Sequence, residues 1–255
     1  MLNQKSHQFP IMMSYTRRKR GGVGGYNNLA IWRKAMAILT VPNPNLEKIA
    51  IDSNYKRAKR VLDLAITLLL LVPLCLVCVM VAVMIRLDSK GAIFYRQKRV
   101  GLDGKEFYMY KFRSMVEHCD DAVHRAAITK FMSGEKLSTY KNVNDPRITR
   151  VGRFIRKTSL DELPQFLNVV RGEMSLVGPR PPLPYEVEHY RPQDWLRLSG
   201  KPGLTGGWQV YGRSQVPFEE MVQMDIAYLR RQSIWEDLKL ILLTIPVMIQ
   251  GRGGA

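Results

Sequence analysis

The longest apolar stretch of the chain runs from Val61 to Ile85 and predicts a helix embedded in a membrane. Asp63 is its single charged residue, and its 25 residues exceed the roughly 20 that a helix needs to span a bilayer. Pro73 lies near the middle, where it would remove a backbone hydrogen bond and bend the helix. We therefore expect residues 56–88 to form a membrane helix that is broken at Pro73.

Basic residues flank this apolar stretch on both sides. Four lie between positions 56 and 60, and five lie between positions 86 and 99. A spanning helix carries its basic residues mainly on the cytoplasmic side, whereas a helix that enters the membrane, breaks and returns keeps both flanks in the cytoplasm. We favour this re-entrant arrangement over an ordinary span, although prolines also kink spanning helices. A buried core helix of a soluble protein fits this length and apolarity least well.

Downstream of the apolar stretch, the pattern predicts a β-hairpin followed by helices. Residues 94–100 and 106–112 alternate between apolar and polar side chains, and Asp103-Gly104 lies between them, which is a strong hairpin signal. Helical patterns follow over residues 116–132, 185–198, 218–231 and 238–249. The last of these is apolar enough to lie at a membrane surface. The expected fold is α+β and mostly helical, with an N-terminal re-entrant membrane helix, a small β-hairpin, and a cytosolic-face domain with amphipathic interfacial helices.

The charge of the chain indicates a polyanionic partner. Lys and Arg total 39 against 22 Asp and Glu, which gives a net charge of +17 and a pI near 10.0. Residues 1–60 hold 12 of the basic residues and only two acidic ones, so we expect residues 1–55 to form a basic, partly disordered arm. Residues 1–25 contain no apolar core of signal-peptide length, and we expect no export by that route. Nucleic acid, anionic lipid and phosphate-bearing substrates are all partners that such a charge favours.

Two adjacent carboxylates, Asp161 and Glu162, are the strongest candidates for chemistry. Ser159 and Glu162 have the spacing of a capping box, which predicts that Asp161 lies in the first turn of a helix. Backbone N–H groups and the positive end of the helix dipole would keep its carboxylate ionised there. Pro164 fits a first turn but not a later one, so the point at which the helix starts stays open. By itself, an Asp-Glu pair also fits an ordinary charged helix start.

Several cations come close to this pair in the predicted elements. Arginines recur at three-residue steps over residues 147–156, which places them along one helical face. Lys111 and Arg113 share a face of the second strand, and a rigid proline turn holds Arg180. A glycine-rich loop over residues 201–214 carries further basic and aromatic residues. Solvated basic faces and ordinary loops are the alternative interpretation of these features.

A series of short motifs links these features along the chain. They are Lys59-Arg60-x-x-Asp63, Phe94-Tyr95-Arg96-Gln97-x-Arg99-Val100-Gly101, Lys111-Phe112-Arg113-Ser114-Met115, Asp145-Pro146-Arg147-Ile148-Thr149, Ser159-Leu160-Asp161-Glu162-Leu163-Pro164-Gln165, Met174-Ser175-Leu176-Val177-Gly178-Pro179-Arg180-Pro181, Pro202-Gly203-Leu204-Thr205-Gly206, Gly212-Arg213 and Asp237-x-Lys239. Each motif is weak alone, but the ordered set resembles the bacterial sugar transferases, the monotopic phosphoglycosyl transferase family. The resemblance covers roughly residues 56–253. Where many members have Ser-Pro at the helix break, this chain has Val72-Pro73.

The resemblance implies a reaction and the residues that perform it. A nucleotide diphosphate sugar, usually a UDP-sugar in this family, gives its sugar-1-phosphate to polyprenyl (undecaprenyl) phosphate and leaves as a nucleoside monophosphate. Asp161 is implied as the nucleophile that carries the phosphosugar, and Glu162 as the carboxylate that helps to hold Mg²⁺. A carboxylate is a competent nucleophile in such transfers, and Mg²⁺ prefers oxygen ligands. The residues implied to bind the substrates are Lys111, Arg113, Arg156, Arg180, Arg213, Asp225 and Asp237.

The resemblance also implies how the chain is organised and where it works. Residues 1–55 would be the basic arm, 56–88 the re-entrant membrane helix and 89–255 the catalytic domain, without the additional multi-span domain of larger members. We expect the protein in the bacterial inner (cytoplasmic) membrane, with its active site on the cytoplasmic face, at the first membrane step of exopolysaccharide, lipopolysaccharide or glycoconjugate assembly. Its expected partners are the nucleotide-sugar donor, the polyprenyl phosphate acceptor and membrane lipids, and homo-oligomerisation stays open.

Two other classes of protein compete with this interpretation. A polyanion-binding protein without catalysis would explain the net charge, but it would not explain the apolar stretch. The sequence also carries no recognised nucleic-acid-binding motif, so we expect no nucleic-acid partner. A basic membrane-anchored scaffold would explain the arm and the apolar stretch, but not Asp161 and Glu162 among the arginines. The enzyme hypothesis accounts for all of these features and leaves the sugar and the pathway open.

Overall fold

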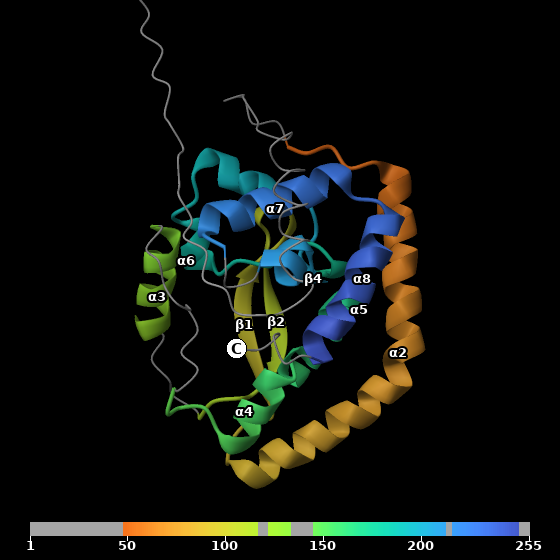
Figure 1. Ribbon diagram of the computed structural model, residues 1–255. Coiled ribbons are helices and arrows are strands. Elements are labelled where there is room, and N and C mark those ends of the chain that lie inside the picture. Colours follow the sequence, from red (N-terminus) through yellow and green to blue (C-terminus); the bar gives the residue numbers. More distant parts are fainter. Residues whose placement is uncertain (1–47, 117–121, 134–144, 213–215, 250–255) are drawn as a thin grey trace, which may run out of the picture.

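A two-stranded antiparallel sheet lies in the middle of the folded domain, with helices around it (Figure 1). The computed structural model describes residues 48–116, 122–133, 145–212 and 216–249, so most of the predicted basic arm lies outside the described residues. Strands β1 (Phe94–Val100) and β2 (Glu106–Phe112) pair along their full length, which confirms the predicted hairpin. In the turn, Asp103 and Gly104 have φ angles of 56° and 79°. Glycine, and to a lesser degree aspartate, adopts such left-handed values with little strain.

Helix α5 (Phe166–Arg171) covers the edge of β2 that β1 leaves open. Asn168 on this helix is fully buried. Its Oδ1 accepts a hydrogen bond from the Tyr110 N–H at 3.1 Å, and its Nδ2 donates to the Tyr108 carbonyl at 2.7 Å. The amide therefore satisfies backbone groups that a third strand would otherwise pair.

A second, parallel pair of strands is not predicted by the sequence pattern. β3 (Ser175–Val177) pairs with β4 (Gly203–Thr205), and each is too short for an alternating pattern to be recognised. The two chain segments approach closely because Gly178 has no side chain: a Cβ added there would lie 2.3 Å from the Lys201 carbonyl oxygen. Gly178 directly precedes the proline turn of Arg180, so this packing fixes where that turn begins.

Helices make up most of the remaining structure, as the sequence predicts. The helix predicted over residues 218–231 is α7 (Phe218–Arg231), and the apolar C-terminal segment is α8 (Ile234–Ile249). The segment predicted as one helix over residues 185–198 is instead α6 (Pro184–Val187) and the 3₁₀ helix η3 (Pro192–Ser199), because a proline cannot continue the hydrogen bonding of a preceding helix. The other helical elements are η1 (Leu102–Gly104), α3 (Ala122–Met132), α4 (Arg150–Lys157), the 3₁₀ helix η2 (Leu160–Gln165) and the π-helical turn η4 (Trp208–Gly212).

The predicted membrane helix is α2, which runs without interruption from Ser53 to Asp88. It begins where the Asp52 carboxylate accepts hydrogen bonds from the backbone N–H groups of Asn54 and Tyr55. Pro73 lies inside the helix, and Figure 1 shows α2 bending in its middle part, so that its two halves run in different directions. Where we expected a break at Pro73, the helix bends instead. Pro73 has no backbone N–H to donate, so one helical hydrogen bond is missing and the helix bends there. The hydrogen bonds of the neighbouring residues keep the helix continuous.

Both halves of α2 are held by the same domain. In the first half, the Asp63 carboxylate accepts hydrogen bonds from the Ser175 hydroxyl and from the Leu176 N–H, both at 3.0 Å. In the second half, Val81 and Ile85 are buried in a cluster with side chains of β2 and α4. The two ends of the apolar stretch are therefore attached to one folded body.

The middle of α2 exposes its apolar side chains. Leu69 is 79% exposed, and Leu68 and Val72 are exposed to a similar extent. Among the described residues, α2 is the one helix that is long and apolar enough to cross a membrane by length and composition. Helix α8, which lies beside the first half of α2 (Figure 1), adds the exposed side chains of Trp235 and Leu242. The core helix of a soluble protein would bury such residues, so the exposure supports membrane association.

Candidate active site

Asp161 and Glu162 lie on η2, a short turn that two leucines attach to the rest of the molecule. Leu160 and Leu163 pack against the cluster that contains the second half of α2 and Ile155 of α4. A spacing of three residues places both leucines on one side of a 3₁₀ helix, while Asp161 and Glu162 lie between them in the sequence and are half-buried. Helix α2 thus supports the turn that carries the two carboxylates.

The capping box predicted from Ser159 and Glu162 does not form. Ser159 has a left-handed backbone (φ 58°, ψ 17°), and its side chain makes no capping hydrogen bond. A capping hydroxyl needs an extended backbone to reach the N–H groups of the first turn. The Ser159 carbonyl instead accepts from the Glu162 N–H at 3.2 Å. A left-handed conformation outside glycine costs about 1–3 kcal/mol and often marks a functional site, and here it lies two residues before Asp161.

Lys111 of β2 reaches Glu162 across the molecule. Its Nζ lies 2.8 Å from Glu162 Oε1, and the two side chains are 21% and 45% exposed. A pair as exposed as this contributes about 0–1 kcal/mol to the free energy of unfolding, so its main effect is to fix the positions of the two side chains. It holds a cation and a carboxylate next to Asp161. The structure therefore brings together three of the predicted site residues, from β2 and η2.

Arg99 also belongs to this neighbourhood, although it is not among the site residues predicted from the sequence. Its buried guanidinium donates to the Pro181 carbonyl at 2.9 Å. Burial and the charge of Arg180 lower the pKa of Arg99 to about 10, while the carboxylate of Glu162 acts in the opposite direction. Arg99 thus stays positively charged at neutral pH. The signal was present in the sequence, because in the hairpin register Arg99 and Lys111 lie on the same face of the sheet.

Arg180 extends from the proline turn. Its guanidinium carbon lies 5.7 Å from the centre of the Trp208 ring, within the range of a cation–π contact. Its carbonyl accepts a hydrogen bond from Arg197 at 3.1 Å, and Arg197 is paired with Asp225, both side chains being 1% exposed. Burial raises the pKa of Asp225 to about 6, and Arg197 opposes that rise. Asp225 is therefore placed inside the protein, where it supports the turn of Arg180 through Arg197.

Other predicted substrate-binding arginines lie at separate places in the structure. The Arg113 guanidinium donates to the carbonyls of Ser89 and Lys90 at 2.8 and 2.7 Å, and so closes the C-terminal end of α2. Arg156 is half-buried in the last turn of α4, shortly before η2. Arg213 lies outside the described residues. Their contacts with substrate stay predictions.

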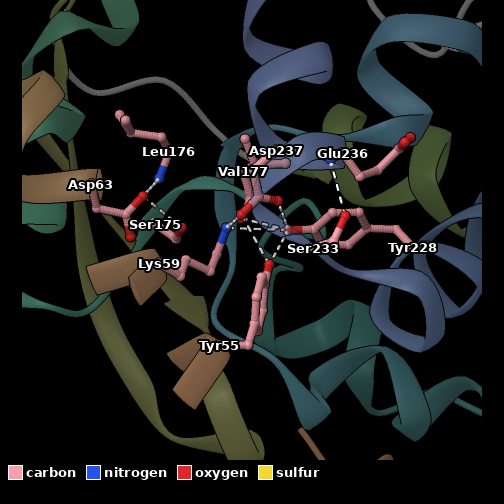
Figure 2. Close-up of polar contacts among 10 residues, drawn as sticks. All are labelled: Tyr55, Lys59, Asp63, Ser175, Leu176, Val177, Tyr228, Ser233, Glu236 and Asp237. Atoms are coloured by element: carbon pink, nitrogen blue, oxygen red, sulfur yellow. Dashed lines mark hydrogen bonds and ion pairs between the residues drawn. The ribbon is translucent and has the colours of Figure 1, made fainter. Parts of the chain in front are cut away.

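Asp237 is the centre of a buried polar cluster that joins α2, α7 and α8 (Figure 2). Its carboxylate accepts from Lys59 Nζ at 2.7 Å, from the Tyr55 hydroxyl at 2.9 Å and from the Tyr228 hydroxyl at 2.6 Å. Burial and the adjacent Asp237 carboxylate raise the pKa of Tyr228 well above its ordinary value, so this hydroxyl keeps its proton and remains a donor. Asp237 thus attaches the start of α2 to the domain, in a cluster distinct from the residues around Glu162.

The two carboxylates on η2 fit a magnesium ion that substrate phosphates help to bind. Mg²⁺ in such sites usually takes one or two protein carboxylates and completes its shell with water and phosphate oxygens. Within the described part of the chain, no three or more His, Cys, Asp or Glu side chains gather in a metal-binding group. Glu162 and the adjacent Asp161 are the carboxylates that could hold such an ion together with the donor diphosphate.

The chain is similar to known proteins along most of its length. Residues 10–251 match the family described as bacterial sugar transferase. The chain is 42% identical over 224 residues to the UDP-galactose-lipid carrier transferase of Erwinia amylovora, which covers 88% of this chain and 46% of that protein. It is 41% identical over 198 residues to the UDP-glucose:undecaprenyl-phosphate glucose-1-phosphate transferase of Escherichia coli (strain K12), with 74% of this chain and 39% of the relative covered.

A third relative is only slightly longer than the segment that matches this chain. The exopolysaccharide production protein ExoY of Rhizobium meliloti (strain 1021) is 38% identical over 222 residues, which cover 87% of this chain and 97% of ExoY. The chain therefore spans less than half the length of the first two relatives and almost all of the third.

Proposed function

Because this chain belongs to the bacterial sugar transferase family, we propose that it transfers a sugar-1-phosphate from a UDP-sugar to polyprenyl phosphate. The names of two relatives specify a UDP-sugar, and one of them specifies undecaprenyl phosphate as the acceptor. The products would be a polyprenyl-diphosphate-sugar and UMP. This reaction would take place at the cytoplasmic face of the inner membrane, as the first membrane step in the assembly of a surface polysaccharide or glycoconjugate.

The arrangement around Asp161 carries this proposal. Two adjacent carboxylates lie on a turn anchored by leucines, and Lys111 is paired with Glu162 at 2.8 Å. Arg99, whose pKa responds to both Arg180 and Glu162, adds a second source of positive charge, and this one is buried. Offsetting the negative charge of the transferred group is the main requirement of phosphoryl transfer. A scaffold without catalysis has no need for a nucleophile surrounded in this way.

The proposed reaction has two steps at one phosphorus atom. A carboxylate oxygen of Asp161 attacks the phosphorus that carries the sugar, and the bond from that phosphorus to the bridging oxygen breaks, so that UMP leaves with the electron pair. A phosphate oxygen of the polyprenyl acceptor then attacks the same phosphorus, and the Asp161 carboxylate is released unchanged. A bound Mg²⁺ would neutralise part of the phosphate charge. Division into two displacements implies ping-pong kinetics.

The proposed function is tested with the purified full-length chain in detergent. With Mg²⁺ and polyprenyl phosphate, it should release UMP from at least one member of a panel of UDP-sugars and form a lipid-linked product. Without the acceptor, release should stop at about one UMP per protein molecule, because the phosphosugar stays on Asp161. Absence of UMP release from every donor by folded protein, or continuous release that needs no lipid, would contradict the proposal.

We also propose that α2 is re-entrant. A straight helix of 36 residues would be about 54 Å long, and a span would place its two ends on opposite sides of a hydrocarbon core of about 30 Å. In the structure, Asp63 in the first half and Ile85 in the second half are both buried against the same domain. The bend in the middle of α2 (Figure 1) allows both contacts. One folded domain lies on one side of a membrane, so these contacts support entry and return on that side.

Cysteine labelling reports this topology directly. In a chain that lacks Cys75, Cys78 and Cys119, single cysteines at the exposed positions of Asn54 and Lys90 should both react with an impermeant reagent from the cytoplasmic side. A cysteine in place of Lys105, on the hairpin turn, marks the side of the domain and serves as the reference. Reaction of the Asn54 and Lys90 positions from opposite faces, with Pro73 intact, would identify an ordinary span.

A further inference from the structure

Two cations converge beside Gly172, at the level where α2 becomes apolar. A Cβ added to Gly172 would lie 3.5 Å from Lys201 Nζ and 3.7 Å from Arg60 Nη2. The two nitrogens therefore approach the same point, one from α2 and the other from the segment before β4. Burial and the charge of Arg60 lower the pKa of Lys201, and Asp63 opposes this. The site forms no part of the group around Glu162.

The two cations differ in their hydrogen-bond partners. Arg60 donates to the carbonyls of Val169 and Val170, at the C-terminal end of α5, at 2.5 and 2.8 Å. Lys201 Nζ makes no hydrogen bond or ion pair with any residue that the structure describes. The carboxylate that acts on it, Asp63, already accepts hydrogen bonds from β3. A half-buried ammonium next to a guanidinium is unfavourable unless an anion joins them.

Exposed apolar side chains begin directly next to this pair. Leu64 and Leu68 follow Arg60 at steps of four residues along α2 and so lie on its side of the helix, and they are 38% and 71% exposed. From α5, Leu167 and Val170 are also exposed. The surface thus changes from cationic to apolar within one helical turn, which is the pattern of a membrane interface.

We propose that Arg60 and Lys201 bind the phosphate group of an anionic phospholipid. The phosphate oxygens supply the acceptors that Lys201 lacks, and the acyl chains lie along the apolar side chains that start at Leu64. A free phosphate would leave this apolar surface uncovered. The acceptor of the proposed reaction has to reach Asp161 on η2, whereas the two cations lie beside Gly172, at the far end of α5 along the chain, a helix about 9 Å long. The site would fix the depth of α2 relative to the lipid head groups, and it does not depend on the transfer reaction.

Lipid binding to the full-length chain in detergent tests this assignment by native mass spectrometry. The wild-type protein should retain phosphatidylglycerol more tightly than phosphatidylcholine, and Lys201→Gln should weaken retention of phosphatidylglycerol about fivefold, as expected for one cation at a membrane surface. Lys201→Arg should preserve binding. Lys105→Gln removes the same charge from an exposed position on the hairpin turn and should leave binding unchanged. Folding of each variant is checked by circular dichroism.

Competition separates the sources of phosphate. Inorganic phosphate at the same concentration should not displace phosphatidylglycerol, and polyprenyl phosphate should bind without dependence on Lys201. Equal retention of phosphatidylglycerol by the wild type and Lys201→Gln would overturn the proposal. Displacement by inorganic phosphate, or binding of polyprenyl phosphate that is lost in Lys201→Gln, would assign the site to a free phosphate or to the acceptor. None of these readouts requires activity, so they stand apart from the test of the proposed function.

Discussion

Asp161→Asn should abolish transfer, with a fall in kcat of at least about a thousandfold. The amide has the size of the carboxylate but is not a competent nucleophile toward phosphorus, so no covalent phosphosugar can form. The fold should persist, because η2 is held by Leu160 and Leu163, and Asp161 is only half-buried. Turnover is measured as UMP release at saturating donor and acceptor. Intact mass after incubation with donor alone should show one added phosphosugar in the wild type and none in Asp161→Asn.

Glu162→Gln is the matched control for this substitution. It removes the neighbouring carboxylate, which is the partner of Lys111, and leaves the nucleophile in place. We expect weak residual turnover that needs more Mg²⁺, together with a detectable phosphosugar adduct. Near wild-type turnover by Asp161→Asn would refute the assignment of the nucleophile. A ternary-complex kinetic pattern without any adduct in the wild type would refute the two-step reaction.

The elements that the sequence predicted well are those with strong local signals. The hairpin has alternating strands and an Asp-Gly turn, and α7 has a clear helical pattern without internal proline. The β3–β4 pair and the contact of Asn168 with β2 depend on segments that are far apart in the sequence, and no local pattern encodes such pairing. The capping box failed for a related reason. The spacing of Ser159 and Glu162 was correct, but the backbone of Ser159 is left-handed, a conformation that a spacing rule does not include.

In the candidate site too, local features could be predicted from the sequence and contacts between distant segments could not. The sequence could place Lys111 on a strand and Glu162 on a helical turn, but their contact spans 51 positions and required the fold. Asp225 and Asp237 were assigned to substrate binding by resemblance, and the structure buries both against cationic partners. In a single sequence, an aspartate that faces a substrate and an aspartate that faces an internal cation look alike. Burial and partners distinguish them, and both are properties of the folded chain.

Asp225→Ala should destabilise the protein by about 3–5 kcal/mol. The substitution leaves Arg197, which is 1% exposed, with a buried charge and no hydrogen-bonded carboxylate. The groups that remain hydrogen-bonded to it, the Tyr190 hydroxyl and the Arg180 carbonyl, carry no negative charge, and the buried Glu186 carboxylate acts on it only without a hydrogen bond. For a protein of this size, the midpoint of thermal unfolding should fall by about 6–20 °C. Circular dichroism of the detergent-solubilised protein measures this shift against the wild type.

A double variant distinguishes the effect of an unpaired buried charge on stability from the effect of lost packing. Arg197→Met combined with Asp225→Leu removes both charges and keeps similar volumes, so most of the lost stability should return. If Asp225→Ala lies within about 1 kcal/mol of the wild type, a value typical of exposed pairs, the pair is not desolvated in solution. Asp225 would then become a candidate for direct contact with the substrate again.

The same double variant tests how Asp225 acts on the reaction. Arg197 donates to the carbonyl of Arg180, so the stable double variant should still lose the hydrogen bond that fixes the Arg180 turn. We expect kcat/KM for the UDP-sugar to fall about tenfold or more, a size typical of lost positioning, while the adduct stoichiometry at Asp161 stays unchanged. Arg180→Lys should give a similar defect. When Arg180→Lys is combined with the double variant, the loss of kcat/KM should be smaller than the separate losses predict, because both act through the Arg180 guanidinium. Fully additive effects would instead show that Asp225 and Arg180 contribute independently, and the positioning role would have to be abandoned.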